Sequence, residues 1–556
     1  MAVSSSTTSL VRLAALGGLG EIGLNLLVVE YGGYGIIVDA GVMFPPRPSF
    51  GRGLLMPDLA YLEQSRIELL GVFLTHAHED HIGALPHLIK RFPLPVHGTA
   101  LTLAFARRRL QEYRQADGTD LRTFAPGKIV ELGPFRVEAI RVTHSTPDSI
   151  ALAISTPAGV IVHSGDFKID EAPVDGQRFD RERFARLGAK GVELLLSDST
   201  NVERPGRSVS ESSLKPILRE LVLRSRSRFF LSAFSSHIHR IRQVAEISRD
   251  AGRLVVPLGR RMIESVRMGV ELGQLDFPPG TFIDVAEADF VAAKHLTFLT
   301  GGSQAEPSSA LTRLAADNYP RVHVEAGDTV VLSSRFIPGN ERPINTLIND
   351  LYKLGADVVY ETVAPVHASG HASRDELLEL IRLVRPKFFV PIHGEYRHLS
   401  RHVALAAEAG IPPRNCFLLE NGDVLVMENR QARRGPSVTA GRMPIGTEAS
   451  EDPILIDERR ALAHGGTIVA VVAISSKTGK ITAGPELISR GLVSGDGTSV
   501  HMRRVREELT ARLTQLEGPL IPGDLRVRDE IMRTLQSYFI EVLGKRPLVV
   551  PHLMEV

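Results

Sequence analysis

Short apolar runs, bounded by glycine, proline or polar residues, alternate with amphipathic stretches along the first part of the chain. Runs of this length and composition are typical of buried strands. Four of them are expected to be strands: 35–38, 135–142, 159–163 and 193–196. Two longer stretches are expected to be helices: 82–91 and 101–113. Strands and helices mixed in this way predict a layered α/β architecture.

The pattern changes near Ser210, where helical and apolar stretches begin to alternate. Helices are expected over 211–224, 238–251 and 261–272, with strands over 229–231 and 254–256. This βαβ-like order predicts a second parallel-sheet unit that runs to about residue 362.

Strand signals resume at 387–390, so a further part of the chain returns to sheet structure. The polar stretch 429–442 has few apolar residues and is expected to be a linker. A compact C-terminal domain should follow, with a strand near 467–474 and a helix over 499–517.

Composition narrows the class of protein. The chain has 556 residues, 43% of them hydrophobic and 23% charged, which suits several soluble globular domains. No apolar run is long enough to cross a bilayer, so no membrane association is expected. The single cysteine, Cys416, excludes an intrachain disulfide and favours a reducing, cytoplasmic location. A net charge of +1 means that charge alone does not indicate nucleic-acid binding.

The segment 75–81 (Thr-His-Ala-His-Glu-Asp-His) carries the densest group of metal-ligand side chains. It directly follows the apolar run 69–74, so His76 and His78 should project from the end of a strand into one pocket. Asp80 and His81 can then face a second cation. Zinc and manganese favour this mixture of imidazole and carboxylate, and two-metal sites often hydrolyse phosphate esters. A solvated His-rich loop is the alternative interpretation.

Four further polar residues directly follow predicted strands: Asp39, His144, Asp166 and His393. Side chains at strand ends are well placed in a cleft, although any one alone is typical of a turn or cap. Together with the His-rich segment they make two ligand sets: His76, His78 and His144, and Asp80, His81 and His393. Asp166 can bridge the two sets, and Asp39 can orient an imidazole or the nucleophilic water.

These residues resemble the metallo-β-lactamase signature. Three later motifs resemble those of the β-CASP nucleases: Ser-Asp-Ser-Thr at 197–200, His-Ala-Ser-Gly-His at 367–371 and Pro-Ile-His-Gly-Glu at 391–395. The segments 17–25 and 484–491 resemble the bacterial ribonuclease J family, so the resemblance covers almost the entire chain.

The resemblance implies an α/β fold made of a four-layer αββα metallo-β-lactamase sandwich with an inserted parallel-sheet domain and a small α/β C-terminal domain. The sandwich would comprise 1–209 and 366–430, the β-CASP domain 210–365, a linker 431–460 and the C-terminal domain 461–556. Members of this family hold two divalent metal ions per subunit, zinc or manganese. They cleave RNA internally and from the 5′ end, prefer single-stranded RNA with a 5′ monophosphate, and act in RNA maturation and decay. Homodimers or homotetramers in the bacterial cytoplasm are implied.

The resemblance also suggests how the reaction ends. Metal-activated water would attack the phosphodiester and expel the 3′ oxygen, leaving a 5′ phosphate and a 3′ hydroxyl. His371 is the candidate proton donor to that oxygen, with Asp198 holding its imidazole charged and oriented. A simple phosphate contact is the alternative for His371, and a helix cap is the alternative for Asp198.

Phosphate-binding candidates lie in two segments. Ser232, Ser235, Ser236 and His237 lie between a predicted strand and a predicted helix, where amides and hydroxyls can hold a phosphate. The second segment contributes His367, Ala368, Ser369, Gly370 and His371. Glycine there permits a close approach of the backbone. A turn with ordinary caps remains the alternative for the serine segment.

Three other functions compete with a ribonuclease. A hydrolase of small lactams or thioesters would not need the insertion from about Ser210 to Thr362, which suits a long groove. A non-catalytic RNA-binding scaffold should have gaps in its ligand set, and none is found. A DNA nuclease is the nearest alternative, because metals and phosphates are indifferent to the sugar.

Overall fold

The computed structural model of this protein describes residues 10–44, 54–337, 340–445, 458–459, 461–463, 465–492, 500–521 and 524–556. The chain divides into two compact units. The first comprises Met1–Met43 with Leu55–Met443, and the second comprises Phe44–Leu54 with Pro444–Val556.

Two sheets form the core of the first unit. Among the described residues, the larger sheet has eight strands in the order β22-β21-β1-β3-β4-β6-β7-β8. Its strands are β1 (Leu10–Gly17), β3 (Leu26–Tyr31), β4 (Tyr34–Val38), β6 (Glu68–Phe73), β7 (Val96–Gly98), β8 (Leu121–Thr123), β21 (Val424–Glu428) and β22 (Gln431–Arg434).

The second sheet has six described strands in the order β19-β13-β12-β11-β10-β9. They are β9 (Ile129–Leu132), β10 (Phe135–Arg141), β11 (Ile150–Thr156), β12 (Gly159–His163), β13 (Leu194–Asp198) and β19 (Phe388–Ile392). Buried side chains of both sheets, among them Val29, Phe73, Val137 and Leu196, pack into one hydrophobic core. The two sheets therefore lie face to face.

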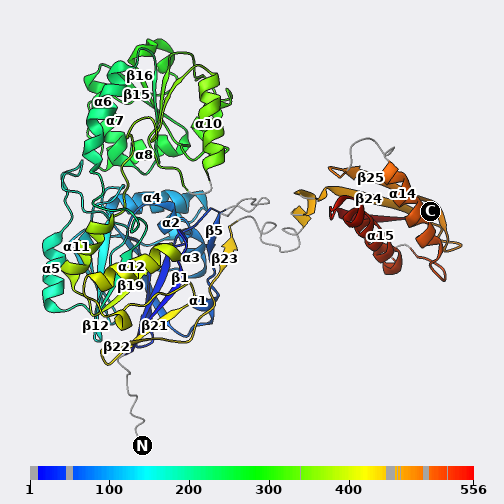
Figure 1. Ribbon diagram of the computed structural model, residues 1–556, viewed down its shortest axis with the longest axis horizontal. Helices are drawn as coiled ribbons and strands as arrows, with labels where there is room; N and C mark the ends of the chain where they lie inside the picture. The colour runs from blue at the N-terminus through cyan, green and yellow to red at the C-terminus, as the bar shows by residue number, and fades with distance from the viewer. Residues whose placement is uncertain are drawn as a thin grey trace, which may run out of the picture. The chain divides into compact units, whose positions relative to one another are not determined.

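Helices cover the outer faces of this pair of sheets (Figure 1). Helices α5 (Arg181–Lys190), α11 (Arg374–Val384) and α12 (Tyr396–Glu408) bury apolar side chains against the six-stranded sheet. Helices α1 (Ala60–Gln64), α3 (Leu85–Arg91) and α4 (Ala100–Glu112) belong to the eight-stranded side. The αββα sandwich that the sequence predicted is confirmed.

An all-parallel sheet is inserted between β13 and β19. Its order among the described strands is β15-β16-β14-β17-β18. The strands are β14 (Phe229–Ser232), β15 (Leu254–Leu258), β16 (Leu296–Thr300), β17 (Thr329–Leu332) and β18 (Asp357–Val359). Helices α6 (Lys215–Arg224), α7 (Ile238–Asp250), α8 (Arg260–Glu271), α9 (Ala310–Ala315) and α10 (Glu341–Lys353) accompany this sheet. A second parallel-sheet unit was predicted at this position, and it is present.

Three predicted segments differ in detail from the structure. The stretch 82–91 is not one helix, because a turn at Gly83 and Ala84 separates α2 (Glu79–Ile82) from α3. The stretch 211–224 is not one helix, because a 3₁₀ turn at Glu211–Leu214 precedes α6. Pro216 lies in the first turn of α6 and has no N–H for a longer helix. The predicted linker 431–460 begins with a strand, because Gln431–Arg434 pairs with β21. Its polar composition suits an edge strand, and residues 446–457 lie outside the described part.

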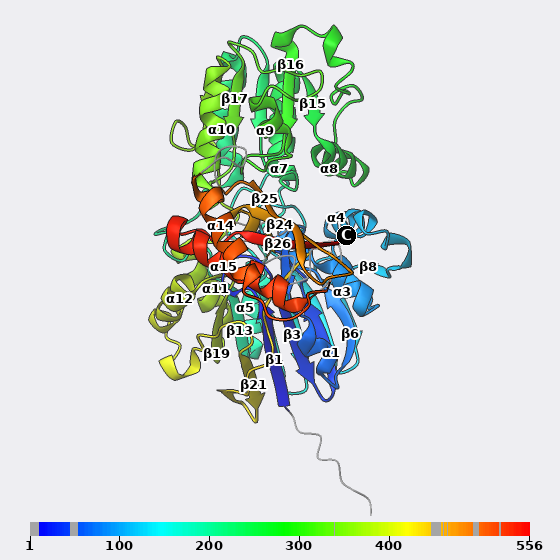
Figure 2. The same ribbon diagram turned by 90° about the vertical axis from the view of Figure 1, so that its right-hand side faces the viewer.

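The second unit contains a sheet in the order β25-β24-β26 (Figure 2). Its strands are β24 (Thr467–Ile474), β25 (Ile481–Arg490) and β26 (Leu548–Glu555). Apolar side chains of α14 (Val500–Thr514) and α15 (Leu525–Leu543) pack against one face of this sheet. The predicted strand 467–474 and most of the predicted helix 499–517 are present, while Ser499 lies outside the described residues. In the described part of the chain, no helix is long and apolar enough to span a membrane.

Candidate metal centre

The ligand candidates lie where neighbouring strands end at one edge of the sandwich. Strands β12, β13 and β19 are adjacent and parallel. They are followed or ended by Asp166, Asp198 and His393. On the other sheet, β4 and β6 are adjacent and parallel, and they lead to Asp39 and His76. Because parallel strands end at the same edge of a sheet, residues far apart in sequence meet there.

The first ligand cluster contains three imidazoles and a carboxylate. His76 Nε2 lies 3.0 Å from His78 Nδ1, and His144 Nε2 lies 3.2 Å from the same atom. Asp166 Oδ2 lies 3.6 Å from His76 Nε2. One ligand atom from each of these four residues falls within 4.8 Å of the others. This geometry suits a single cation.

The second ligand cluster contains Asp80, His81 and His393, and it shares Asp166 with the first. Asp166 Oδ2 lies 3.3 Å from His81 Nε2 and 3.6 Å from His393 Nε2. His393 Nε2 lies 3.2 Å from Asp80 Oδ2. The shared carboxylate of Asp166 is thus positioned to bridge two cations.

The charges around the clusters fit metal binding. Burial lowers the pKa of His78 to about 4 and holds the pKa values of His76 and His144 well below the usual range, so these imidazoles are neutral and keep a free lone pair. Burial also opposes protonation of His81, but Asp166, Asp39 and Asp80 outweigh it and raise the pKa to about 10. The carboxylates around the second cluster thus stabilise positive charge at this position, which a bound cation would supply in place of the proton.

Neighbouring groups fix the orientation of the ligand imidazoles. Asp39 Oδ2 accepts a hydrogen bond from His81 Nδ1 at 2.7 Å, and Thr75 binds both carboxylate oxygens of Asp39. Thr200 Oγ1 lies 2.7 Å from His393 Nδ1. Hydrogen bonds of this kind set the tautomer and the ring plane of a ligand. Neither Thr75 nor Thr200 was predicted from the sequence to orient a ligand.

Gly370 holds His144 by a backbone contact. His144 Nδ1 donates to the carbonyl oxygen of Gly370 at 2.7 Å. A Cβ atom at Gly370 would lie 2.7 Å from His144 Cε1, which is closer than any real side chain comes. Glycine is thus required for this approach, and it brings the predicted segment 367–371 to the metal centre.

His371 and Asp198 lie beside the two clusters. His371 Nδ1 is 2.8 Å from Asp198 Oδ2. Burial lowers the pKa of His371, but Asp198 outweighs it, and the net shift is upward. Asp198 thus favours the protonated form of the His371 imidazole. These two residues also form a possible ligand group with Asp166 and His393, so a third cation position is the competing use of His371.

The two phosphate-binding candidate segments meet beside a buried ion pair. Arg240 of α7 donates to both carboxylate oxygens of Glu211 and to the carbonyl oxygen of Val366. His237 Nε2 lies 3.5 Å from Glu211 Oε2. Both Glu211 and Arg240 act on the pKa of His367, which burial lowers to about 3.

Polar atoms in both segments remain available for a ligand. Within the described ranges, Ser232 Oγ, His237 Nε2 and His367 Nδ1 are buried without a hydrogen-bond partner. Ser369 Oγ accepts from Asn201. Ser235 and Ser236 are half-buried, and their side chains form no hydrogen bond with any residue that the structure describes. Ala368 is buried and has no polar side-chain atom. The serine and histidine segments thus share one polar neighbourhood.

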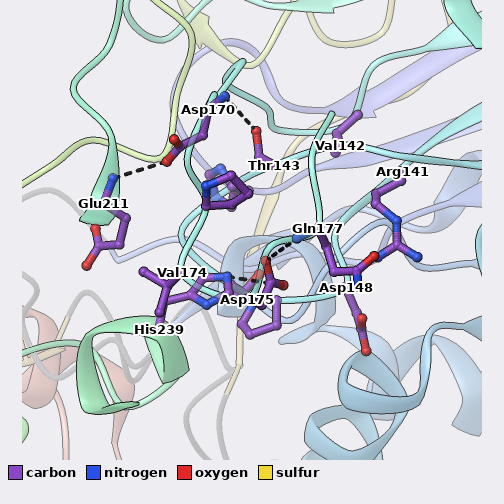
Figure 3. Close-up of a pocket in the computed structure, with 14 residues that line it drawn as sticks. Arg141, Val142, Thr143, Asp148, Asp170, Val174, Asp175, Gln177, Glu211 and His239 are labelled. Carbon is purple, nitrogen blue, oxygen red and sulfur yellow. Dashed lines mark hydrogen bonds and ion pairs between the residues drawn. The ribbon is translucent and has the colours of Figure 1, made fainter. Parts of the chain in front are cut away.

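A cavity adjoins the metal centre at His144 (Figure 3). Asp170 and Asp175 line it from the sandwich, and Glu211 and His239 line it from the start of the insertion. His239 Nε2 lies 3.9 Å from Asp175 Oδ2. The loop after β12 therefore links the metal-centre edge to the inserted domain.

Family models match most of the chain. The metallo-beta-lactamase superfamily model matches residues 20–187, and the model "Ribonuclease J, beta-CASP domain" matches 226–351. The model "Zn-dependent metallo-hydrolase RNA specificity domain" matches 355–416, and the model "Ribonuclease J C-terminal domain" matches 454–556.

Proteins named ribonuclease J are similar to this chain over most of its length. A ribonuclease J of Mycobacterium tuberculosis is 37% identical over 99% of this chain and 98% of its own length. A ribonuclease J of Synechocystis is 39% identical over 88% of this chain and 77% of its own length. Ribonuclease J2 of Bacillus subtilis is 33% identical over the full length of both chains.

A solved structure shares the fold. The crystal structure of a protein of unknown function from Enterococcus faecalis has a TM-score of 0.53 and 18% identity, and it covers 75% of this chain and 100% of its own. This likeness supports the fold alone.

Proposed function

The chain belongs to the ribonuclease J family of metal-dependent ribonucleases, and on that premise we propose that it hydrolyses single-stranded RNA both internally and from the 5′ end. The observation that carries the proposal is the pair of ligand clusters that share Asp166. Such an arrangement suits the two sides of a phosphodiester, where one oxygen attacks and another leaves.

His76, His78 and His144 would hold one divalent ion, and Asp80, His81 and His393 the other, with Asp166 between them. Zinc or manganese ions in these positions supply Lewis acidity at the phosphate and acidify a bound water. Asp39, Thr200 and Gly370 keep three of the imidazoles in place. The seven proposed ligands come from four separate segments of the chain.

His371 would complete the reaction as a general acid. Breaking the bond between phosphorus and the 3′ oxygen leaves an alkoxide that must gain a proton. The imidazolium of His371, held by Asp198, supplies that proton, so the products carry a 5′ phosphate and a 3′ hydroxyl. In this role Asp198 acts through His371 and does not contact the substrate.

A terminal phosphate would bind between the serine and histidine segments. Ser232, Ser235, Ser236 and His237 come from the inserted domain, and His367, Ala368, Ser369 and Gly370 come from the chain that returns to the sandwich. The unpartnered polar atoms of Ser232, His237 and His367 support this site. A pocket of this kind would favour a 5′ monophosphate over a bulkier triphosphate.

The family relationship further supports a role in RNA maturation and decay in the bacterial cytoplasm. It also supports assembly into homodimers or homotetramers, as proposed from the sequence.

A direct test uses metal-defined protein and matched RNA and DNA strands that carry different 5′ ends. Cleavage of the RNA with 5′-phosphate and 3′-hydroxyl products is expected, with the DNA strand cut far more slowly. Equal cleavage of the RNA and DNA strands would show that the protein is a nuclease that does not distinguish ribose from deoxyribose. No cleavage of either strand would refute the proposed function.

A further inference from the structure

The inserted domain contacts the sandwich through helices α8 and α4, which lie one over the other (Figure 1). Charged side chains line this contact. Arg260 of α8 donates to Glu112 of α4 at 3.3 Å. Arg108 Nε of α4 lies 4.0 Å from Glu264 Oε2 of α8. The two domains are thus joined here by pairs of opposite charge.

Glu79 extends this network to the metal centre. It lies between the ligand candidates His78 and Asp80 in sequence. Its carboxylate is 3.8 Å from Arg108 Nη2 and 4.0 Å from Arg261 Nη1 of α8. Arg108 therefore lies between a carboxylate of the ligand segment and a carboxylate of the inserted domain.

The pairs of Arg108 with Glu79 and Glu264, at 3.8 and 4.0 Å, are too long to be hydrogen bonds, which have N···O distances of about 2.7–3.2 Å. The Arg108 side chain is only 11% exposed. Over the part of the chain that the structure describes, its Nε and Nη1 atoms have no hydrogen-bond partner, and the same is true of Oε2 of Glu79 and of Glu264. Buried charged groups without hydrogen-bond partners are costly. Arg109 Nε, at 3.7 Å from Glu79 Oε2, is likewise too far away to form such a bond. A shift of about 1 Å between the domains would bring these atoms into hydrogen-bond range.

We propose that Arg108 is a positioning residue that couples closure of α8 onto α4 to the placement of His78 and Asp80. When the inserted domain moves toward the sandwich, Arg108 gains a bond to Glu264 and keeps Glu79 in a fixed position. Peptide bonds join Glu79 to His78 on one side and to Asp80 on the other, so the position of Glu79 constrains the positions of both ligand residues. Misplacement of a reacting group by about 1 Å can cost about a hundredfold in rate.

This role rests on the proposed function, because RNA long enough to contact both domains is what favours closure. A small phosphodiester such as bis(p-nitrophenyl) phosphate is too short to bridge the two domains, so its hydrolysis would not depend on closure. The two substrates therefore separate interdomain coupling from the chemistry of the metal centre.

The test compares the full-length, manganese-loaded protein with the variants Glu264→Gln, Arg108→Ala and the double variant. Each single change should lower kcat for RNA by about tenfold, while hydrolysis of the small ester and the metal content stay unchanged. The double variant should be no slower than Arg108→Ala alone, because the two residues act through each other. Arg108→Lys should also lower kcat for RNA, because a single ammonium group cannot bridge two carboxylates. This variant keeps the positive charge and serves as a second test in case Arg108→Ala does not fold.

Arg267→Ala is the matched control. Arg267 lies on α8 and pairs with Glu271 of the same helix at 3.6 Å, with both side chains exposed. This variant should match the wild type on both substrates. Additive losses in the double variant, equal losses on the small ester, or loss of metal would overturn the positioning role. Failure of the wild type to cleave RNA would remove the proposed function and this role together.

Discussion

The Nδ1 atom of His371 lies 2.8 Å from Oδ2 of Asp198, although 173 positions separate the two residues. Asp198 ends strand β13, and His371 lies in the segment that returns from the inserted domain. The segment that leaves the inserted domain therefore places the His371 imidazole beside residues of both ligand clusters.

Replacement of His371 tests the proton donor. His371→Ala should lower kcat by about 10²- to 10⁴-fold, because the leaving alkoxide loses its proton source. Metal content, measured on the purified variant, should stay at the wild-type value. A drop in metal content would instead assign His371 to the third ligand group, with Asp166, Asp198 and His393.

The Asp39→Asn variant tests the orientation of His81. Because the Asp39 carboxylate accepts from His81 Nδ1 at 2.7 Å, its loss should weaken binding of one cation by about 10- to 100-fold. Titration against a competing chelator measures this affinity. Asp120→Asn is the control, since Asp120 pairs with Arg122 on the surface, and unchanged affinity in Asp39→Asn would exclude the orienting role.

The terminal-phosphate pocket predicts a preference among RNA ends. An RNA with a 5′ triphosphate should be degraded from that end more slowly than the same RNA with a 5′ monophosphate, because the site proposed at the unpartnered polar atoms of Ser232, His237 and His367 would hold a single terminal phosphate. Time courses with end-labelled RNA measure both rates. Equal rates would contradict the pocket.

The buried imidazole of His97 should make the folded protein less stable in acid. The ring is buried and stacks on Phe73, and within the described residues neither ring nitrogen has a hydrogen-bond partner. Burial lowers its pKa in the folded state from 6.5 to about 4. The unfolded chain binds the proton more readily, so the stability that neutral His97 contributes is present above pH 6.5 and is lost as the pH falls toward 4.

The His97→Phe variant should remove this acid sensitivity. The melting temperature of the wild type should fall between neutral pH and about pH 5, and the variant should lose roughly 1–3 °C less over the same range. His295→Phe is the control, because His295 is exposed on the inserted domain. Parallel pH profiles for His97→Phe and the wild type would contradict the prediction.

Much of the fold follows from local sequence patterns. The strand predicted at 159–163 and the strand predicted at 467–474 match β12 and β24 residue for residue. The clustering of Asp166 and His393 was also predictable, because polar residues after parallel strands share one edge of a sheet. The ligand roles themselves stay predictions.

Other features depend on tertiary contacts that no local pattern carries. Thr200 lies 2.7 Å from His393 Nδ1, yet in sequence it resembles an ordinary turn threonine. The strand at Gln431–Arg434 is polar because it lies at a sheet edge, so its pattern resembles a linker. The contact of Arg108 with Glu79 and Glu264 likewise joins three distant segments.

We propose that segments distant in sequence build one site where two bound cations promote the hydrolysis of RNA. The most direct test is to titrate metal-free protein with Mn²⁺ while following RNA cleavage and bound metal together. Activity should be absent in the metal-free protein and should reach its maximum when two ions are bound per chain, whereas His76→Ala should remain folded and inactive. Cleavage without metal, or full activity with a single ion bound, would contradict the account.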